Sequence, residues 1–204
     1  MKWLFVPQAS QGSPYRRAKS DIWLVIPPAV ENACGMEITM NISQIIIKAI
    51  QYFGNDAKRV NHFMKVYGYA KTIGELEHLN EREQDILEVA AILHDIGIKI
   101  SEEKYGSSAG IYQEKEGPAV AEQLLKNSGY DKEFVERVKY LIGHHHTYDN
   151  ITGMDYQILV EADFIVNIYE DDMDWSAIKK IIDRIFRTET GTLIVKEMFL
   201  QSDK

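Results

Sequence analysis

The stretch "EREQDILEVAAILHDIG" (residues 81–97) carries the clearest information about the fold. Residues 86–93 are apolar at almost every position, so a helix formed here has hardly any polar face and must be buried on all sides. Asn80 can cap the start of this helix, and Gly97 indicates where it ends. We therefore predict that this segment is the central helix of the fold.

Two side chains of the metal-ligand type, His94 and Asp95, stand at the end of this apolar helix. Neighbouring side chains on a regular helix point about 100° apart, but both can reach one point where a helix ends. One interpretation is a metal site. The other is that Asp95 accepts hydrogen bonds from nearby backbone N–H groups while His94 interacts with the helix dipole.

Helical periodicity continues along the chain from residue 41, and no alternating strand pattern follows that residue. We expect an all-α helical bundle, with a Gly- and Ser-rich loop at residues 105–110 and Pro118 in the first turn of a helix. The other segments predicted to be helical are residues 41–53, 57–73, 116–130, 131–146, 154–170, 174–186 and 192–201. The other candidate N-caps are Asn41 or Ser43, Asp56 and Asp131.

The first part of the chain has a different composition. Residues 1–35 hold four of the five prolines, which excludes a long helix, so we expect an irregular, non-helical N-terminal arm followed by a helical domain over residues 36–204. The arm is either an upstream extension or a segment that packs on the body or on a partner through Trp3, Trp23 and Ile26.

The net charge of −8 argues against nucleic acid or an anionic membrane as the main partner, because both attract an excess of Lys and Arg. It does not exclude a small basic pocket for a phosphate. With Cys34 as the single cysteine and no apolar run long enough for a membrane span, we expect a cytoplasmic protein. A homodimer is left open.

Two further polar side chains lie in apolar helical patterns, where an unpaired polar group would be costly to bury. His62 adjoins the apolar stripe of residues 57–73, and Asp163 is flanked by apolar residues in "LVEADFIVN" (159–167). Together with His94 and Asp95 they make two imidazoles and two carboxylates. This set suits one divalent ion such as Mn²⁺, Fe²⁺, Co²⁺, Ni²⁺ or Mg²⁺ better than a structural zinc site, which prefers thiolates.

A triplet of histidines, "GHHHT" (residues 143–147), follows another predicted helix. Three consecutive residues cannot all face one site on a regular helix. One or two of His144, His145 and His146 are therefore candidates for the site, and the sequence leaves open which.

This order of residues resembles the HD superfamily of metal-dependent phosphohydrolases. "RVNHFMKVYGYA" (59–70) looks like the family's first ligand helix, "AAILHDIGIK" (90–99) like its namesake HD segment, and "LVEADFIVN" (159–167) like the helix with its final aspartate. The resemblance covers about half of the chain and implies the HD-domain helical bundle.

The resemblance also implies a chemistry, in which a bound metal ion activates water for attack on phosphorus. The metal ligands that it implies are His62, His94, Asp95 and Asp163. The catalytic candidates are Asp95, His145 and His146. The candidate contacts to substrate phosphate are Lys99, Lys65 and Arg59.

Departures from the family pattern bear on a second metal and on the substrate. The stretch that often begins His-Pro in dinuclear members has Gly117 before its proline, so that ligand is missing, and Glu114 or Glu116 would have to replace it. No GYP motif follows the histidine triplet, and residues 96–99 ("IGIK") lack the acidic pair of ppGpp hydrolases and the glutamate of deoxynucleotide monophosphatases.

We therefore expect a phosphohydrolase that acts on a nucleotide or another small phosphoester. The alternatives are a non-catalytic metal- or nucleotide-binding sensor on the same scaffold, a di-iron oxygenase, and a purely structural helical protein.

Overall fold

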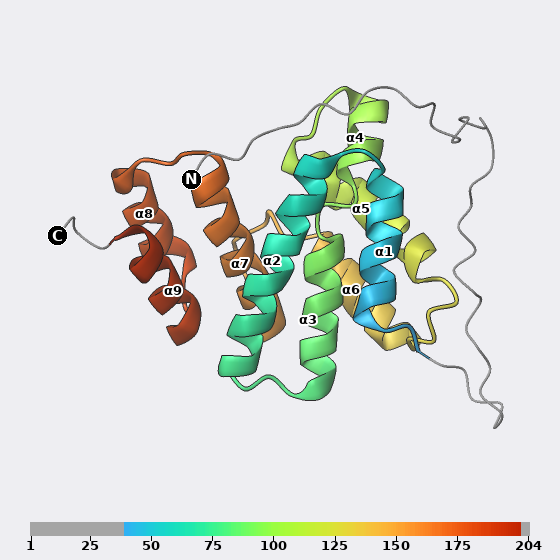
Figure 1. Ribbon diagram of the computed structural model, residues 1–204, viewed down its shortest axis with the longest axis horizontal. Coiled ribbons are helices and arrows are strands. Elements are labelled where there is room, and N and C mark those ends of the chain that lie inside the picture. The colour runs from blue at the N-terminus through green and yellow to red at the C-terminus, as the bar shows by residue number, and fades with distance from the viewer. Residues whose placement is uncertain (1–38, 201–204) are drawn as a thin grey trace, which may run out of the picture.

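The computed structural model describes residues 39–200, and over this range the chain is built from α-helices with no strand (Figure 1). The helices are α1 Ile42–Phe53, α2 Ala57–Leu76, α3 Glu81–Leu93, α4 Ile98–Tyr105, α5 Gly110–Leu125, α6 Lys132–Ile142, α7 Met154–Glu170, α8 Trp175–Ile185 and α9 Glu189–Phe199. The predicted all-α fold class is confirmed. The predicted arm, residues 1–35, lies outside the described residues.

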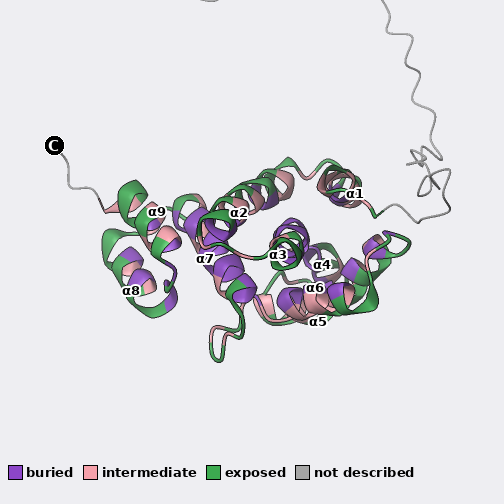
Figure 2. Cartoon of the chain, turned by 90° about the horizontal axis from the view of Figure 1, so that it is seen from below, coloured by how far each residue is buried: buried purple, intermediate pink, exposed green. Residues whose placement is uncertain are grey.

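Helix α3 is the centre of the bundle, as its apolar sequence predicts. It packs against α1, α2, α6 and α7, and Figure 2 shows it enclosed by them. All residues from 86 to 93 are buried, including Glu88, whose carboxylate accepts hydrogen bonds from Lys71 at 2.8 Å and from Gln84 at 3.0 Å. A buried helix with no exposed face can present the residues at its end to the interior of the molecule.

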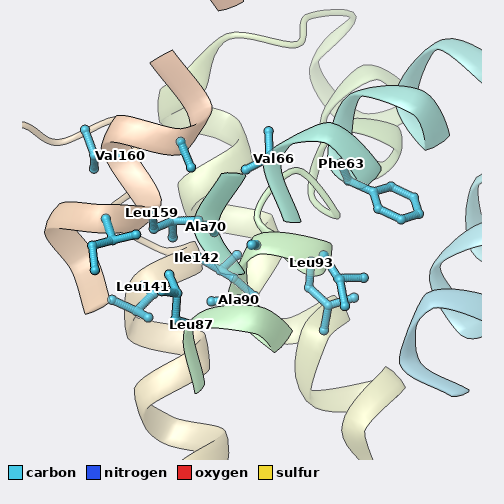
Figure 3. Packing of buried hydrophobic residues seen from close by; sticks show 14 of the residues in the cluster. Phe63, Val66, Ala70, Leu87, Ala90, Leu93, Leu141, Ile142, Leu159 and Val160 are labelled. Carbon is cyan, nitrogen blue, oxygen red and sulfur yellow. The ribbon is translucent and has the colours of Figure 1, made fainter. Parts of the chain in front are cut away.

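The core lies where four helices meet, so side chains far apart in the sequence pack together (Figure 3). Each such side chain contributes about 1.5–3 kcal/mol when it leaves water. The members labelled in that view include Val66 and Ala70 of α2, Leu87, Ala90 and Leu93 of α3, Leu141 and Ile142 of α6, and Leu159 and Val160 of α7.

The helix starts follow the predicted N-caps. A side-chain oxygen of each cap accepts a hydrogen bond from the backbone N–H three residues later, which satisfies a group that the helix itself cannot. Asn41, and not Ser43, caps α1. The other predicted caps that make this bond are Asp56, Asn80 and Asp131.

The region after α3 differs from the prediction. An additional helix, α4, fills residues 98–105, and α5 starts at Gly110 and therefore holds Pro118 in its interior and not in its first turn. The ring of Pro118 lies near Gly143, where even a Cβ would come within 3.2 Å of the proline Cγ. α6 ends at Ile142, so the histidine triplet lies in a turn and not on the predicted helix.

Helices α8 and α9 stand beside α7, on the side away from α3 (Figures 1 and 2). The fully buried Glu161 of α7 links them to the bundle, because it accepts hydrogen bonds from the backbone N–H groups of Arg187 at 2.6 Å and Thr188 at 3.0 Å. Among the described residues, no helix is both long and apolar enough to span a membrane.

Candidate metal centre

His94 and Asp95 enter the interior because α3 stops at Leu93. His94 is the C-cap of that helix, still in right-handed helical conformation, and its Nδ1–H donates to the carbonyl of Ala91 at 2.8 Å. This bond turns Nε2 of His94 away from α3, and the bend that follows brings Asp95 to the same side. The helix end therefore presents both ligand-type side chains together.

Gly97 allows this bend to pack closely. A Cβ at Gly97 would lie 2.6 Å from the carbonyl oxygen of Gln113 and 2.8 Å from the backbone nitrogen of Gly117, so only glycine lets α5 approach. A Cβ at Gly117 would in turn lie 2.7 Å from Cγ2 of Ile142. Position 117 is therefore closed by the side chain of Ile142, and no ligand side chain fits there without a shift of its neighbours.

The four predicted ligands converge from α2, the end of α3, and α7. Nε2 of His62 lies 3.3 Å from Nε2 of His94 and 3.2 Å from Oδ1 of Asp163. Nε2 of His94 lies 3.6 Å from Oδ1 of Asp163. Oδ2 of Asp95 lies 3.6 Å from Nε2 of His62 and 3.5 Å from Nε2 of His94. We call these four residues the HHDD cluster.

The electrostatics of the HHDD cluster fit a divalent cation. Burial alone would raise the pKa of Asp95 and of Asp163, but the facing histidines outweigh it and hold both pKa values below their usual range. Burial would likewise lower the pKa of His62, but hydrogen bonds and charges from Asp163, Asp95 and Glu170 raise it to about 9. Two buried carboxylates thus need positive charge, which a metal ion held by neutral histidines would supply.

A second group of donor atoms lies on the other side of Asp95. His145 is buried, its Nδ1–H donates to the carbonyl of Ile142 at 2.8 Å, and its Nε2 lies 3.5 Å from Oδ1 of Asp95. Asp95, His145 and His146 offer three ligand atoms within 4.8 Å of one another. We call these three residues the DHH group.

His146 sits against the start of α5. Its backbone N–H donates to Oε1 of Glu114 at 3.0 Å, and its ring covers Gly110, where a Cβ would come within 2.6 Å of its Cδ2. Burial, together with the charge of the neighbouring His145, lowers the pKa of His146 to about 4. Its imidazole is therefore neutral near pH 7, and its buried Nε2 has no hydrogen-bond partner in the described part of the chain.

The three consecutive histidines, His144, His145 and His146, do not share one environment. His144 stacks on Tyr140 with ring centroids 4.2 Å apart and donates through Nδ1 to the Tyr140 carbonyl at 2.7 Å, so it belongs to the surface of α6. His145 and His146, the two catalytic candidates that the family resemblance implied, are the two at the site.

The three predicted phosphate contacts already have protein partners. Arg59 pairs with Asp56 at 2.8 Å and with Glu102 at 2.6 Å. Nζ of Lys99 donates to the carbonyl of Tyr52 at 3.3 Å. Lys65 pairs with Glu170, which in turn contacts His62, so Lys65 alone of the three reaches the HHDD cluster through a single intervening residue.

Two glutamates contact histidines of the site in ways that were not predicted from the sequence. Glu114, considered from the sequence as a replacement ligand, uses Oε1 to hold the backbone of His146 and the hydroxyl of Thr147, each at 3.0 Å. Glu170, not singled out from the sequence, accepts a hydrogen bond from Nδ1 of His62 at 3.0 Å. Its position seven residues after Asp163, two helical turns along the same face, was the available signal.

Residues 59–189, well over half of the chain, match the family model of the HD domain. A crystal structure of a predicted HD superfamily hydrolase from an uncultured Thermotogales bacterium has a similar fold, with a TM-score of 0.58, 24% sequence identity, and coverage of 79% of this chain and 87% of that chain. No curated protein matches significantly. The chain belongs to the HD-domain family.

Proposed function

We propose that this protein is a metal-dependent phosphohydrolase that acts on a nucleotide or another small phosphoester. The observation that carries the proposal is the convergence of His62, His94, Asp95 and Asp163, from three separate helices, on one buried point. A structural role does not require two buried carboxylates and two imidazoles to face each other in this way, because each of these groups is costly to bury without a partner.

The donor atoms favour one divalent ion of the Mn²⁺, Fe²⁺, Co²⁺, Ni²⁺ or Mg²⁺ type, since two nitrogens and two carboxylates without thiolate are typical of such ions. When bound, such an ion lowers the pKa of a coordinated water and polarises a phosphoryl oxygen. A second ion would have only the DHH group, with Asp95 shared between both sets, because Gly117 leaves the position of a further ligand closed.

Residues of the chain itself supply the remaining parts of the reaction. His62, His94 and Asp163 would hold the ion together with Oδ2 of Asp95, whose Oδ1 faces His145. His146 is neutral and partly buried, with its Nε2 shielded from solvent, so this nitrogen can accept a proton from a nucleophile or, once protonated, donate one to a leaving group. The low exposure of the cluster strengthens these interactions by excluding water.

The three cations expected to contact the substrate phosphate are each held by a protein partner. Arg59 and Lys99 would have to leave their protein partners to reach a phosphate, and Lys65 would have to leave Glu170. The histidines of the DHH group lie beside the HHDD cluster without such a change, which supports a role for them in holding the phosphate as well as in proton transfer.

The test is a hydrolysis screen of purified protein over nucleoside mono-, di- and triphosphates and simple phosphoesters, with Mn²⁺, Co²⁺, Ni²⁺ or Mg²⁺ added singly to metal-free protein. The proposal expects turnover that depends on the metal, and release of phosphate or of pyrophosphate from a triphosphate identifies the bond that is broken. Metal binding without turnover of any substrate would favour the sensor alternative. Failure to bind any of the four ions would contradict both.

A further inference from the structure

Three histidines at the site, His62, His94 and His145, differ in the group that accepts a hydrogen bond from Nδ1, the ring nitrogen that points away from the site. Nδ1 of His94 donates to the carbonyl of Ala91, and Nδ1 of His145 donates to the carbonyl of Ile142, each at 2.8 Å and each three residues earlier in the chain. Nδ1 of His62 instead donates at 3.0 Å to a carboxylate oxygen of Glu170, which lies 108 residues away. His62 is thus the member of this set that is oriented across a helix interface.

The positions of Glu170 and His62 on their helices explain this contact. Glu170 is the last residue of α7 and lies two helical turns after Asp163, so the helix face that presents Asp163 also presents Glu170. Helix α2 packs along α7 and places Lys65 one turn after His62. Lys65 pairs with Oε1 of Glu170 while His62 occupies Oε2, so both carboxylate oxygens are bound.

The Glu170 carboxylate acts as an acceptor in this setting. Its side chain is only 15% exposed, and one oxygen faces the ammonium group of Lys65 while the other faces Nδ1 of His62. A carboxylate paired with an ammonium group accepts hydrogen bonds, so the His62 nitrogen that faces it must carry the proton.

We propose that Glu170 is a positioning residue that orients the ring of His62, with Nδ1–H toward Glu170 and Nε2 toward the HHDD cluster, and that Lys65 serves to hold Glu170. A metal-bound histidine needs its remaining proton on Nδ1, because the coordinating nitrogen must be free of a proton. A charged acceptor also makes a bond roughly twice as strong as a neutral one, so it can hold a ring that has no nearby carbonyl partner. The inference rests on the proposed metal site, and it gives Lys65 a role other than the phosphate contact expected from the sequence.

Three variants separate orientation from charge. Glu170→Leu removes the acceptor, and Glu170→Gln keeps an acceptor oxygen for Nδ1–H but removes the charge. Asp171→Asn is the matched control, because it neutralises the adjacent exposed carboxylate.

Binding of Mn²⁺ to metal-free protein is measured from the electron paramagnetic resonance signal of free Mn²⁺. We expect Mn²⁺ affinity to fall about 10- to 100-fold in the Leu variant and less than tenfold in the Gln variant. The control should keep the affinity of the natural protein.

A second readout does not depend on the metal. In metal-free protein the Nδ1 proton of His62, shielded from solvent exchange by Glu170, should give a downfield proton resonance in NMR, assigned by its loss in His62→Asn. We expect this resonance to vanish in Glu170→Leu and to persist in Glu170→Gln and Asp171→Asn. If Glu170→Leu is poorly folded, loss of the charge alone in Glu170→Gln still tests the claim, because the resonance must remain while Mn²⁺ affinity drops.

The two readouts distinguish failure of this inference from failure of the proposed function. A His62 resonance that persists in Glu170→Leu, or equal Mn²⁺ affinity in that variant and the natural protein, overturns the positioning role. A natural protein that shows the expected resonance pattern but binds none of Mn²⁺, Co²⁺, Ni²⁺ and Mg²⁺ overturns the proposed metal site and leaves the role of Glu170 in orienting His62 intact.

Discussion

The ligand-type atoms on the two sides of Asp95 differ in whether each of them has a close polar partner. On one side, Oδ2 faces His62 and His94, and Asp163 completes a set in which each group has close partners. On the other side, Oδ1 faces His145, and the buried Nε2 atoms of His145 and His146 make no hydrogen bond within the described residues. The HHDD cluster therefore has the character of a resident ion site, and the DHH group that of a site for substrate and protons.

Removing Asp95, which both sides share, should have the largest effect. In Asp95→Ala we expect loss of measurable metal binding and a fall in turnover of at least about 10³-fold, because a ligand and the link to His145 disappear together. Helical content by circular dichroism should stay unchanged, since Asp95 lies in a bend and not in the apolar core. Turnover equal to that of the natural protein would contradict the mechanism.

Changing His146 should separate the two sides. In His146→Asn we expect kcat to fall about 10²- to 10⁴-fold, the usual range for loss of a proton-transfer group. Mn²⁺ affinity should stay within about threefold of the natural value, because His146 is not part of the HHDD cluster. His144→Asn is the matched control and should change neither quantity. A loss of metal stoichiometry in His146→Asn would show that the DHH group holds an ion of its own.

The close packing beneath Asp95 should be sensitive to a single methyl group. Gly97→Ala places a Cβ within 2.6 Å of the backbone oxygen of Gln113, which cannot give way as a flexible side chain could. We expect a loss of about 1–3 kcal/mol in the free energy of unfolding, measured by urea denaturation, together with weaker metal binding. Gly68→Ala is the control: nothing lies within 4 Å of its Cβ, and stability should stay equal or rise.

The pH dependence of the metal-free protein should report on the HHDD cluster. The pKa of His62 is raised to about 9 in the fold, against 6.5 for a free histidine, so the folded state binds more protons than the unfolded state between these values. The contribution of His62 to stability is therefore complete below pH 6.5 and is lost as the pH rises through 9. We expect this contribution to be on the order of 3 kcal/mol. Urea denaturation of His62→Gln should show a smaller decline over this window. An equal decline in both proteins would contradict the assignment.

The sequence predicts those parts of the molecule that depend on local pattern. The apolar run of residues 86–93 predicts the central helix, and short polar residues before apolar runs predict the N-caps, because both effects act within a few residues. The HHDD cluster could also be predicted, since His62 and Asp163 are polar residues in patterns that must be buried.

The features that could not be predicted depend on contacts between distant segments. Pro118 lies inside α5 because that helix already starts at Gly110, and its ring packs near Gly143, the C-cap of α6. His144 turns to Tyr140 while its two neighbours turn inward, which the triplet alone does not reveal. Arg59 and Lys99 find acceptors contributed by other helices, and Glu170 is separated from His62 by most of the domain.

The most direct test of the account is to locate the bound ion. Crystals of the protein grown with Mn²⁺ should show one strong anomalous peak, within coordination distance of His62, His94, Asp95 and Asp163, and no second peak of similar height at His145 and His146. A peak confined to the DHH group, or no peak at the HHDD cluster despite Mn²⁺-dependent turnover, would contradict the central claim that these four residues hold the catalytic metal.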